Sequence, residues 1–99
     1  MYSRAAELSR LKLMIERLVD AELLSEVDAA ELLVETDAAN RSLAEADLEA
    51  VRDHIAQVRR ITQALVDCGA LSIEHGGQQI ESAARALAAL EEINANPLQ

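Results

Sequence analysis

The chain is 99 residues long, a length that allows one domain with a single modest core. Ala, Leu and Glu together make 46 residues, against three Gly, one Pro, one Tyr and no Phe or Trp, which is typical of helices and excludes an all-β or α/β domain. Proteins that bind phosphate groups need an excess of basic residues, whereas this chain has a net charge of −9, so we expect neither nucleic acid nor a membrane as a partner.

Two helices are predicted in the first half. Apolar residues at steps of three and four indicate a helix over residues 3–24, with a stripe formed by Leu8, Leu11, Ile15 and Leu18. Ser25 and Asp28 have the spacing of a capping box, which predicts a second helix over residues 26–41. The side of this helix expected to face the core carries Val27, Ala30, Leu33, Val34 and Ala38.

Two further helices are predicted in the second half. A break within residues 40–47, with Ser42 or Asp47 as cap, precedes a third helix that ends before Gly69. Its stripe is Leu48, Val51, Ile55, Val58, Thr62 and Leu65. Ser72 is expected to cap a fourth helix with the stripe Ile73, Ile80, Ala84, Leu87 and Leu90. We expect residues 1–93 to form one domain and residues 94–99 a flexible tail.

An internal repeat relates the two halves. Leu18-Val19-Asp20 followed by Leu24-Ser25 returns 47 residues later as Leu65-Val66-Asp67 followed by Leu71-Ser72. Chance similarity in a helical sequence rich in Ala and Leu is the alternative. A repeated helix, turn and helix predicts an all-α antiparallel four-helix bundle built from two αα-hairpins. Its small core without aromatic residues leads us to expect a homo-oligomer, a homodimer in the simplest case.

His54, beside the stripe of the third helix, is the candidate for chemistry. An exposed His on a four-helix bundle suggests a phosphotransfer domain, in which the imidazole carries a phosphoryl group. That pattern has a Lys three residues after the His and a Gly next to it, whereas this sequence has Gln57 and Val58 there. A boundary histidine on an amphipathic helix is the alternative interpretation.

No other motif indicates catalysis or metal binding. The sequence has no H-E-x-x-H pattern and no cysteine pair, so we expect a non-enzymatic protein without a metal or cofactor. Gly76-Gly77 predicts either the close approach of a neighbouring helix or a loose helix start that admits a ligand. Cys68 is the only cysteine, so it forms no internal disulfide and is expected at a buried or boundary packing position.

The negative charge has a defined location. Residues 20–49 contain ten acids and one base, and outside this range eight acids meet eight bases. Asp28, Glu31 and Glu35 share one side of the second helix and are the predicted binding residues for a basic protein partner. A docking module of a multienzyme assembly is a further hypothesis for a chain with such an acidic face. The alternatives are a solubility role and neutralisation within the bundle by Arg52, Arg59 and Arg60.

The stretch 64–84 resembles the C-terminal half of FIMAH-type domains. It has the apolar helix end before Gly69, the Leu71-Ser72 turn, the Gly at position 76 and the run from Ile80 to Ala84, and residues 11–33 look like the first hairpin of that family. The sequence departs at Val58, where the family often has an aromatic residue, and at Ile73, where it has a Pro. The resemblance implies an accessory or binding module of a larger extracellular or surface protein, with no catalytic residues.

The start of the chain bears on the expected compartment. Met1 is followed by Tyr, Ser and Arg and then by Leu and Glu, without the apolar core of a signal peptide. We therefore expect a cytoplasmic protein by default, and an extracellular one if the chain is an excised domain of the FIMAH type.

Overall fold

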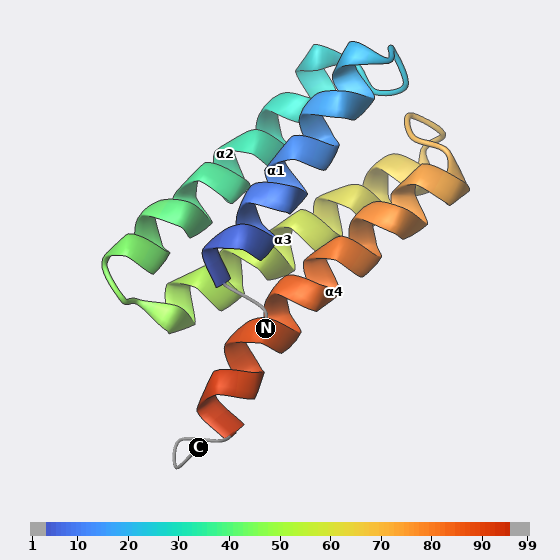
Figure 1. Cartoon of the computed structure of the whole chain (residues 1–99). Helices are drawn as coiled ribbons and strands as arrows, with labels where there is room; N and C mark the ends of the chain where they lie inside the picture. The colour runs from blue at the N-terminus through green and yellow to red at the C-terminus, as the bar shows by residue number, and fades with distance from the viewer. Residues whose placement is uncertain (1–3, 96–99) are drawn as a thin grey trace.

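The computed structural model describes the backbone of residues 4–95 and the side chains of residues 4–90, and it consists of four α-helices (Figure 1). They are α1 (Arg4–Asp20), α2 (Glu26–Ala44), α3 (Leu48–Asp67) and α4 (Ile73–Ala95). Successive helices run antiparallel, α1 and α3 each pack against α2 and α4, and no strand occurs in the described range. The predicted all-α antiparallel four-helix bundle is confirmed.

The helices of each hairpin are joined by a tight turn that closes with the Schellman pattern. At the end of α1 the N–H of Glu22 donates to the Val19 carbonyl (3.0 Å) and the N–H of Leu23 to the Leu18 carbonyl (2.9 Å). The same two bonds recur 47 residues later around Gly69. The α2–α3 turn closes in this way too, so the pattern is a general ending of these helices and not a mark of the repeat alone.

The Schellman turn after α1 holds a non-glycine residue in a left-handed conformation. Glu22 has φ 62°, whereas the equivalent position in the α3–α4 turn is Gly69, with φ 82°. A side chain with a Cβ is strained at positive φ. We expect Glu22→Gly to raise the free energy of unfolding by about 0.5–1 kcal/mol, as measured by urea denaturation.

Ala21→Gly is the matched control for this substitution, because Ala21 lies outside the positive-φ positions of the described chain. It introduces the same flexible residue without relieving strain, and is therefore expected to lower stability. Equal effects of the two substitutions would contradict the assignment of strain to Glu22.

The predicted caps Ser25 and Ser72 are confirmed, and of the two candidates for the third helix Asp47 is the cap, whereas Ser42 is buried within α2. The Oγ of Ser25 accepts the N–H of Asp28 at 3.1 Å at the start of α2, and a carboxylate oxygen of Asp47 accepts the N–H of Ala50 at 3.2 Å at the start of α3. The Oγ of Ser72 accepts the N–H of His75 at 3.1 Å at the start of α4. Each cap satisfies a backbone donor that the helix itself leaves unpaired.

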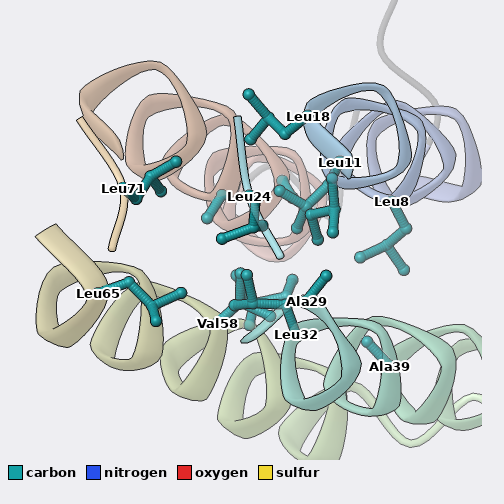
Figure 2. Close-up of a cluster of buried hydrophobic side chains, with 14 of the residues drawn as sticks. Leu8, Leu11, Leu18, Leu24, Ala29, Leu32, Ala39, Val58, Leu65 and Leu71 are labelled. Carbon is teal, nitrogen blue, oxygen red and sulfur yellow. The ribbon is translucent and has the colours of Figure 1, made fainter. Parts of the chain in front are cut away.

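The stripes predicted for α1 and α3 form the centre of the core. Figure 2 shows Leu11, Leu24 and Leu32 pointing into the interior of the bundle. The predicted residues found buried are Leu8, Leu11, Ile15, Leu18, Val51, Ile55, Val58, Thr62 and Leu65. Thr62 is accommodated because its hydroxyl donates to the Val58 carbonyl at 2.7 Å, which satisfies a polar group away from water.

The predicted core side of α2 is wrong at Val27, Ala30 and Val34, which are exposed, whereas Leu33 and Ala38 are half-buried and Leu33 packs against the core. Val27 is 83% exposed and Val34 is 61% exposed, and the buried row is Ala29, Leu32, Thr36, Ala39 and Ser42. Both rows have helical spacing, and the buried one carries the smaller side chains. Small residues let the neighbouring helices approach, and the Thr36 hydroxyl donates to the Leu32 carbonyl at 2.6 Å, so burying it leaves no unpaired donor.

The predicted stripe of α4 is also largely wrong. Ile73 is 82% exposed, Ala84 is exposed, Ile80 and Leu87 are half-buried, and only Leu90 is buried. The core side instead carries Gly76, Gln79, Ser82, Ala83, Ala86 and Ala89. Gln79 is held there because its Nε2 donates to the Thr62 Oγ1 at 2.6 Å. The helix continues to Ala95, two residues beyond the predicted domain end, and residues 96–99 of the predicted tail lie outside the described residues.

Gly76 permits close packing of α4 against the end of α3. A Cβ at Gly76 would overlap the Val66 Cγ2 methyl group, whereas a Cβ at Gly77 would meet nothing within 4 Å. The close-approach interpretation of the glycine pair is therefore correct for Gly76.

Candidate functional site

The bulky apolar row of α2 lies in solvent. Val27, Ala30, Glu31 and Val34 are all exposed on the side of the helix that points away from the core, and we call these four residues the outward face of α2. Exposed apolar side chains that cluster on one surface are typical of interaction sites. Because α2 turns its row of mainly small residues toward the core, the larger side chains of Val27 and Val34 pack against no other helix in the core and are exposed.

A groove runs between α1 and α2 beside the outward face. It has a volume of about 560 Å³, and its apolar residues are Leu13, Val19, Ala29, Ala30 and Leu33. Three carboxylates, Glu16, Asp20 and Glu26, and one guanidinium, Arg17, complete the lining. We call this the α1–α2 groove. It combines an apolar floor with a mainly negative rim.

A smaller hollow lies on the other side of the outward face, between α2 and α3. It has a volume of about 250 Å³ and is lined by Ala30, Glu31, Val34, Glu35 and Ile61. The outward face thus has a depression on each side, and an apolar side chain of a partner can occupy either one.

The three predicted partner-binding acids have different surroundings. Glu31 is exposed, and its carboxylate has no ion pair or hydrogen bond among the described residues. Asp28 is half-buried in the first turn of α2, where its N–H is bound by the cap. Glu35 is half-buried and its Oε1 lies 2.8 Å from the Nδ1 of His54. The structure therefore leaves Glu31 available and directs Glu35 toward α3.

Asp37, another acid of α2, forms an ion pair with α1, which the sequence analysis did not predict. Lys12 of α1 lies 2.9 Å from the Asp37 carboxylate, and this hydrogen bond, together with the negative charge, raises the pKa of Lys12 above its usual value. Arg52, Arg59 and Arg60 form no ion pair with these acids in the described part of the chain. The α2 acids thus stay largely unneutralised by the third helix.

His54 forms a pair with Glu35 across the α2–α3 interface. Because a carboxylate only accepts hydrogen bonds, Nδ1 is the donor in the 2.8 Å contact, and Nε2 has no hydrogen bond to a described residue. Gln57 is half-buried and Val58 is fully buried, so the position where the phosphotransfer pattern has a Gly is occupied here by a core residue.

Other candidate chemistry finds little support in the geometry. Cys68 is exposed, contrary to the packing role expected of it, and its Sγ donates to the Leu65 carbonyl at 3.5 Å. Its position at the end of α3, outside the interior, is the reason. No cluster of three or more His, Cys, Asp and Glu side chains suited to a metal ion occurs among the described residues. No described helix has the length and apolar character needed to cross a membrane.

Comparison with family models, with curated proteins and with solved structures found no significant match. The resemblance to FIMAH-type domains stays a prediction. The α1–α2 groove was missed by sequence reasoning, and the one available signal was Leu13, an apolar residue of α1 outside the predicted stripe.

Proposed function

We propose that the chain is a non-catalytic helical interaction module that binds a basic amphipathic helix of a partner protein. The observation that carries this proposal is the exposed apolar row of α2 beside the α1–α2 groove. Amphipathic helices are commonly recognised by laying their apolar face into such grooves. Leu13, which is 44% exposed, and Leu33 offer the apolar contact in the groove, and Val27 and Val34 are exposed beside it on the outward face of α2.

The charge around the groove supports a basic partner. Glu16, Asp20 and Glu26 line the groove, Glu31 stands on the outward face, and Arg17 is the one basic residue of the groove lining. Complementary charge speeds association and sets the orientation of the partner, whereas the apolar contacts provide most of the affinity. Binding should therefore weaken as the salt concentration rises.

A second copy of the chain is the alternative occupant of this surface. In a two-fold dimer each patch meets the same patch of its partner, so Glu31 and the groove carboxylates would face like charges. This repulsion favours a basic partner over self-association through α2. The expected homo-oligomer stays a prediction, and a mass of 10.7 kDa in sedimentation at high concentration would contradict it.

Charge reversal should separate binding from folding. The probe is a synthetic amphipathic helix of Leu and Lys, about five turns long, with a Leu and Glu helix of the same pattern as its control. We expect the Leu and Lys peptide to bind in calorimetry, and the variant with Glu16→Lys and Glu31→Lys to bind at least about tenfold more weakly with an unchanged unfolding midpoint.

Asp53→Lys is the matched control for these reversals. Asp53 is an exposed acid of α3 that lines neither the α1–α2 groove nor the α2–α3 hollow. Like each groove substitution, Asp53→Lys replaces an acid by a base, but it does so away from the proposed binding surface. It should therefore reduce the affinity for the peptide only slightly. Equal binding of the acidic and basic peptides, or equal losses in Asp53→Lys and the groove variant, would overturn the proposal.

The His54–Glu35 pair supports a second candidate function, phosphotransfer at His54. In that reaction a bond forms between phosphorus and Nε2 as the phosphorus–oxygen bond of the donor breaks, while Glu35 holds the Nδ1 proton. Incubation with acetyl phosphate would then give an acid-labile mass increase that is lost in His54→Ala. The absence of that increase would remove this candidate and leave the interaction module unaffected.

A further inference from the structure

A second pocket lies between α1 and α4, adjacent to the α1–α2 groove, with which it shares Leu13 and Arg17, and its charged lining residues are basic. It has a volume of about 300 Å³. Its apolar residues are Leu13, Met14, Leu18 and Leu23, and its polar residues are Arg10, Arg17, His75 and Gln78. No carboxylate lines it, although the chain carries 18 acids and a net charge of −9. We call it the α1–α4 pocket.

The two arginines of the α1–α4 pocket differ in their surroundings. Arg10 Nη1 lies 3.5 Å from Glu7 Oε1, a carboxylate that is itself buried. The Arg17 guanidinium is exposed and has no ion pair or hydrogen bond to any described residue. A guanidinium presents donors in a fork that matches the two oxygens of a carboxylate. Arg17 is therefore the group in this pocket that is free to take an anion.

The dimensions of the pocket favour a small ligand over a protein helix. On α4 only His75 and Gln78 line it, which is one helical turn, so a long helix would find nothing to follow on that side. A volume of about 300 Å³ is at the lower end of the range of small-molecule sites. Such sites combine a mainly apolar lining with a few polar groups that fix orientation, as here.

We propose that the α1–α4 pocket binds a medium-chain acyl carboxylate. The carboxylate pairs with Arg17, and the acyl chain packs on Met14, Leu18 and Leu23. This site adjoins the α1–α2 groove, with which it shares Leu13 and Arg17, and its ligand has the opposite charge to the partner proposed for α2.

Titration of the full chain with decanoate, followed by amide NMR, tests the proposal. We expect a dissociation constant on the order of 0.1–1 mM, with shifts at residues 10–18, 23 and 75–78. Acetate should not bind, because it lacks the chain, and decylammonium should not shift these residues, because its head is positive. Shifts located elsewhere, or equal effects of decanoate and decylammonium, would overturn the proposal.

Arg17→Glu should weaken decanoate binding at least about tenfold. Arg59→Glu is the matched control, since Arg59 is an exposed arginine of α3 outside the pocket, and it should leave the affinity unchanged. Because Arg17 is also the one base lining the α1–α2 groove, Arg17→Glu should strengthen binding of the Leu and Lys peptide. Arg17→Glu is thus expected to weaken decanoate binding and to strengthen peptide binding. Because the two effects have opposite signs, failure of this proposal can be distinguished from failure of the proposed function.

The same chemistry could be offered by an anionic lipid headgroup, and vesicles distinguish the two sources. We expect no co-sedimentation with vesicles of phosphatidylserine and phosphatidylcholine. Co-sedimentation that is lost in Arg17→Glu, together with no response to decanoate, would assign Arg17 to a membrane surface and overturn the acyl-ligand proposal.

Discussion

Leu32→Ala is expected to lower the free energy of unfolding by about 2–5 kcal/mol, the cost of a cavity left by a fully buried leucine. Leu32 is completely buried in the row of α2 that faces the core. Val34→Ala, two residues away on the outward face, is expected to change stability by less than about 0.5 kcal/mol, because its side chain is already in water. Urea denaturation with matched slopes gives both values.

This pair of substitutions tests which side of α2 faces the core. The sequence favoured the side with Val34, and the structure places Leu32 inside. If the sequence-based orientation held, the order of the two losses would be reversed. Val34→Ala also removes part of the proposed binding row, so it should weaken the Leu and Lys peptide without affecting the unfolding midpoint.

Gly76→Ala is expected to lower the free energy of unfolding by about 1–2 kcal/mol, although alanine is the better helix former. The added Cβ overlaps the Val66 side chain, and this overpacking outweighs the gain of about 1 kcal/mol in helix propensity. Gly77→Ala, at the adjacent position of the same helix, is expected to raise stability by about 0.5–1 kcal/mol, since open space surrounds its Cβ.

A double mutant distinguishes this overlap from a backbone effect. Val66 is half-buried, and Val66→Ala removes the methyl group that a Cβ at position 76 would meet. In the Val66→Ala background, Gly76→Ala should therefore cost much less stability than it does in the natural background. The difference between the two losses is a positive coupling energy between positions 66 and 76. Similar gains for Gly76→Ala and Gly77→Ala in the natural background would show that α3 and α4 are not in close contact at this point.

Helix positions followed from local signals. Ser25, Asp47 and Ser72 each accept a backbone N–H three residues later, as their spacing predicts. These bonds depend only on neighbours in the chain, so a sequence suffices to place them. The stripes of α1 and α3 were predicted for a similar reason, because each has a single face that combines bulk and regular spacing.

The surroundings of the candidate site residues depend on contacts between helices, which the sequence does not report. Of the predicted binding residues, Glu31 is exposed, whereas Glu35 is held by His54 at 2.8 Å. The pairing of Lys12 with Asp37 joins residues that are 25 positions apart, and no local pattern reports it. The α1–α4 pocket likewise combines residues from the two ends of the chain, which meet only in the folded bundle.

The sequence by itself determined the helical class, the number of helices and the caps of α2 and α4, since propensity and capping act within a few residues. Only the tertiary structure decided which row of α2 and of α4 is buried. Two rows in each helix have helical spacing, and the choice depends on how closely the neighbouring backbones approach. Here Ala29 and Ala39 of α2, and Gly76 and Ala83 of α4, allow that approach, and the bulkier Val34 and Ile73 are left in solvent. That exchange creates the exposed apolar surface on which the proposed function depends.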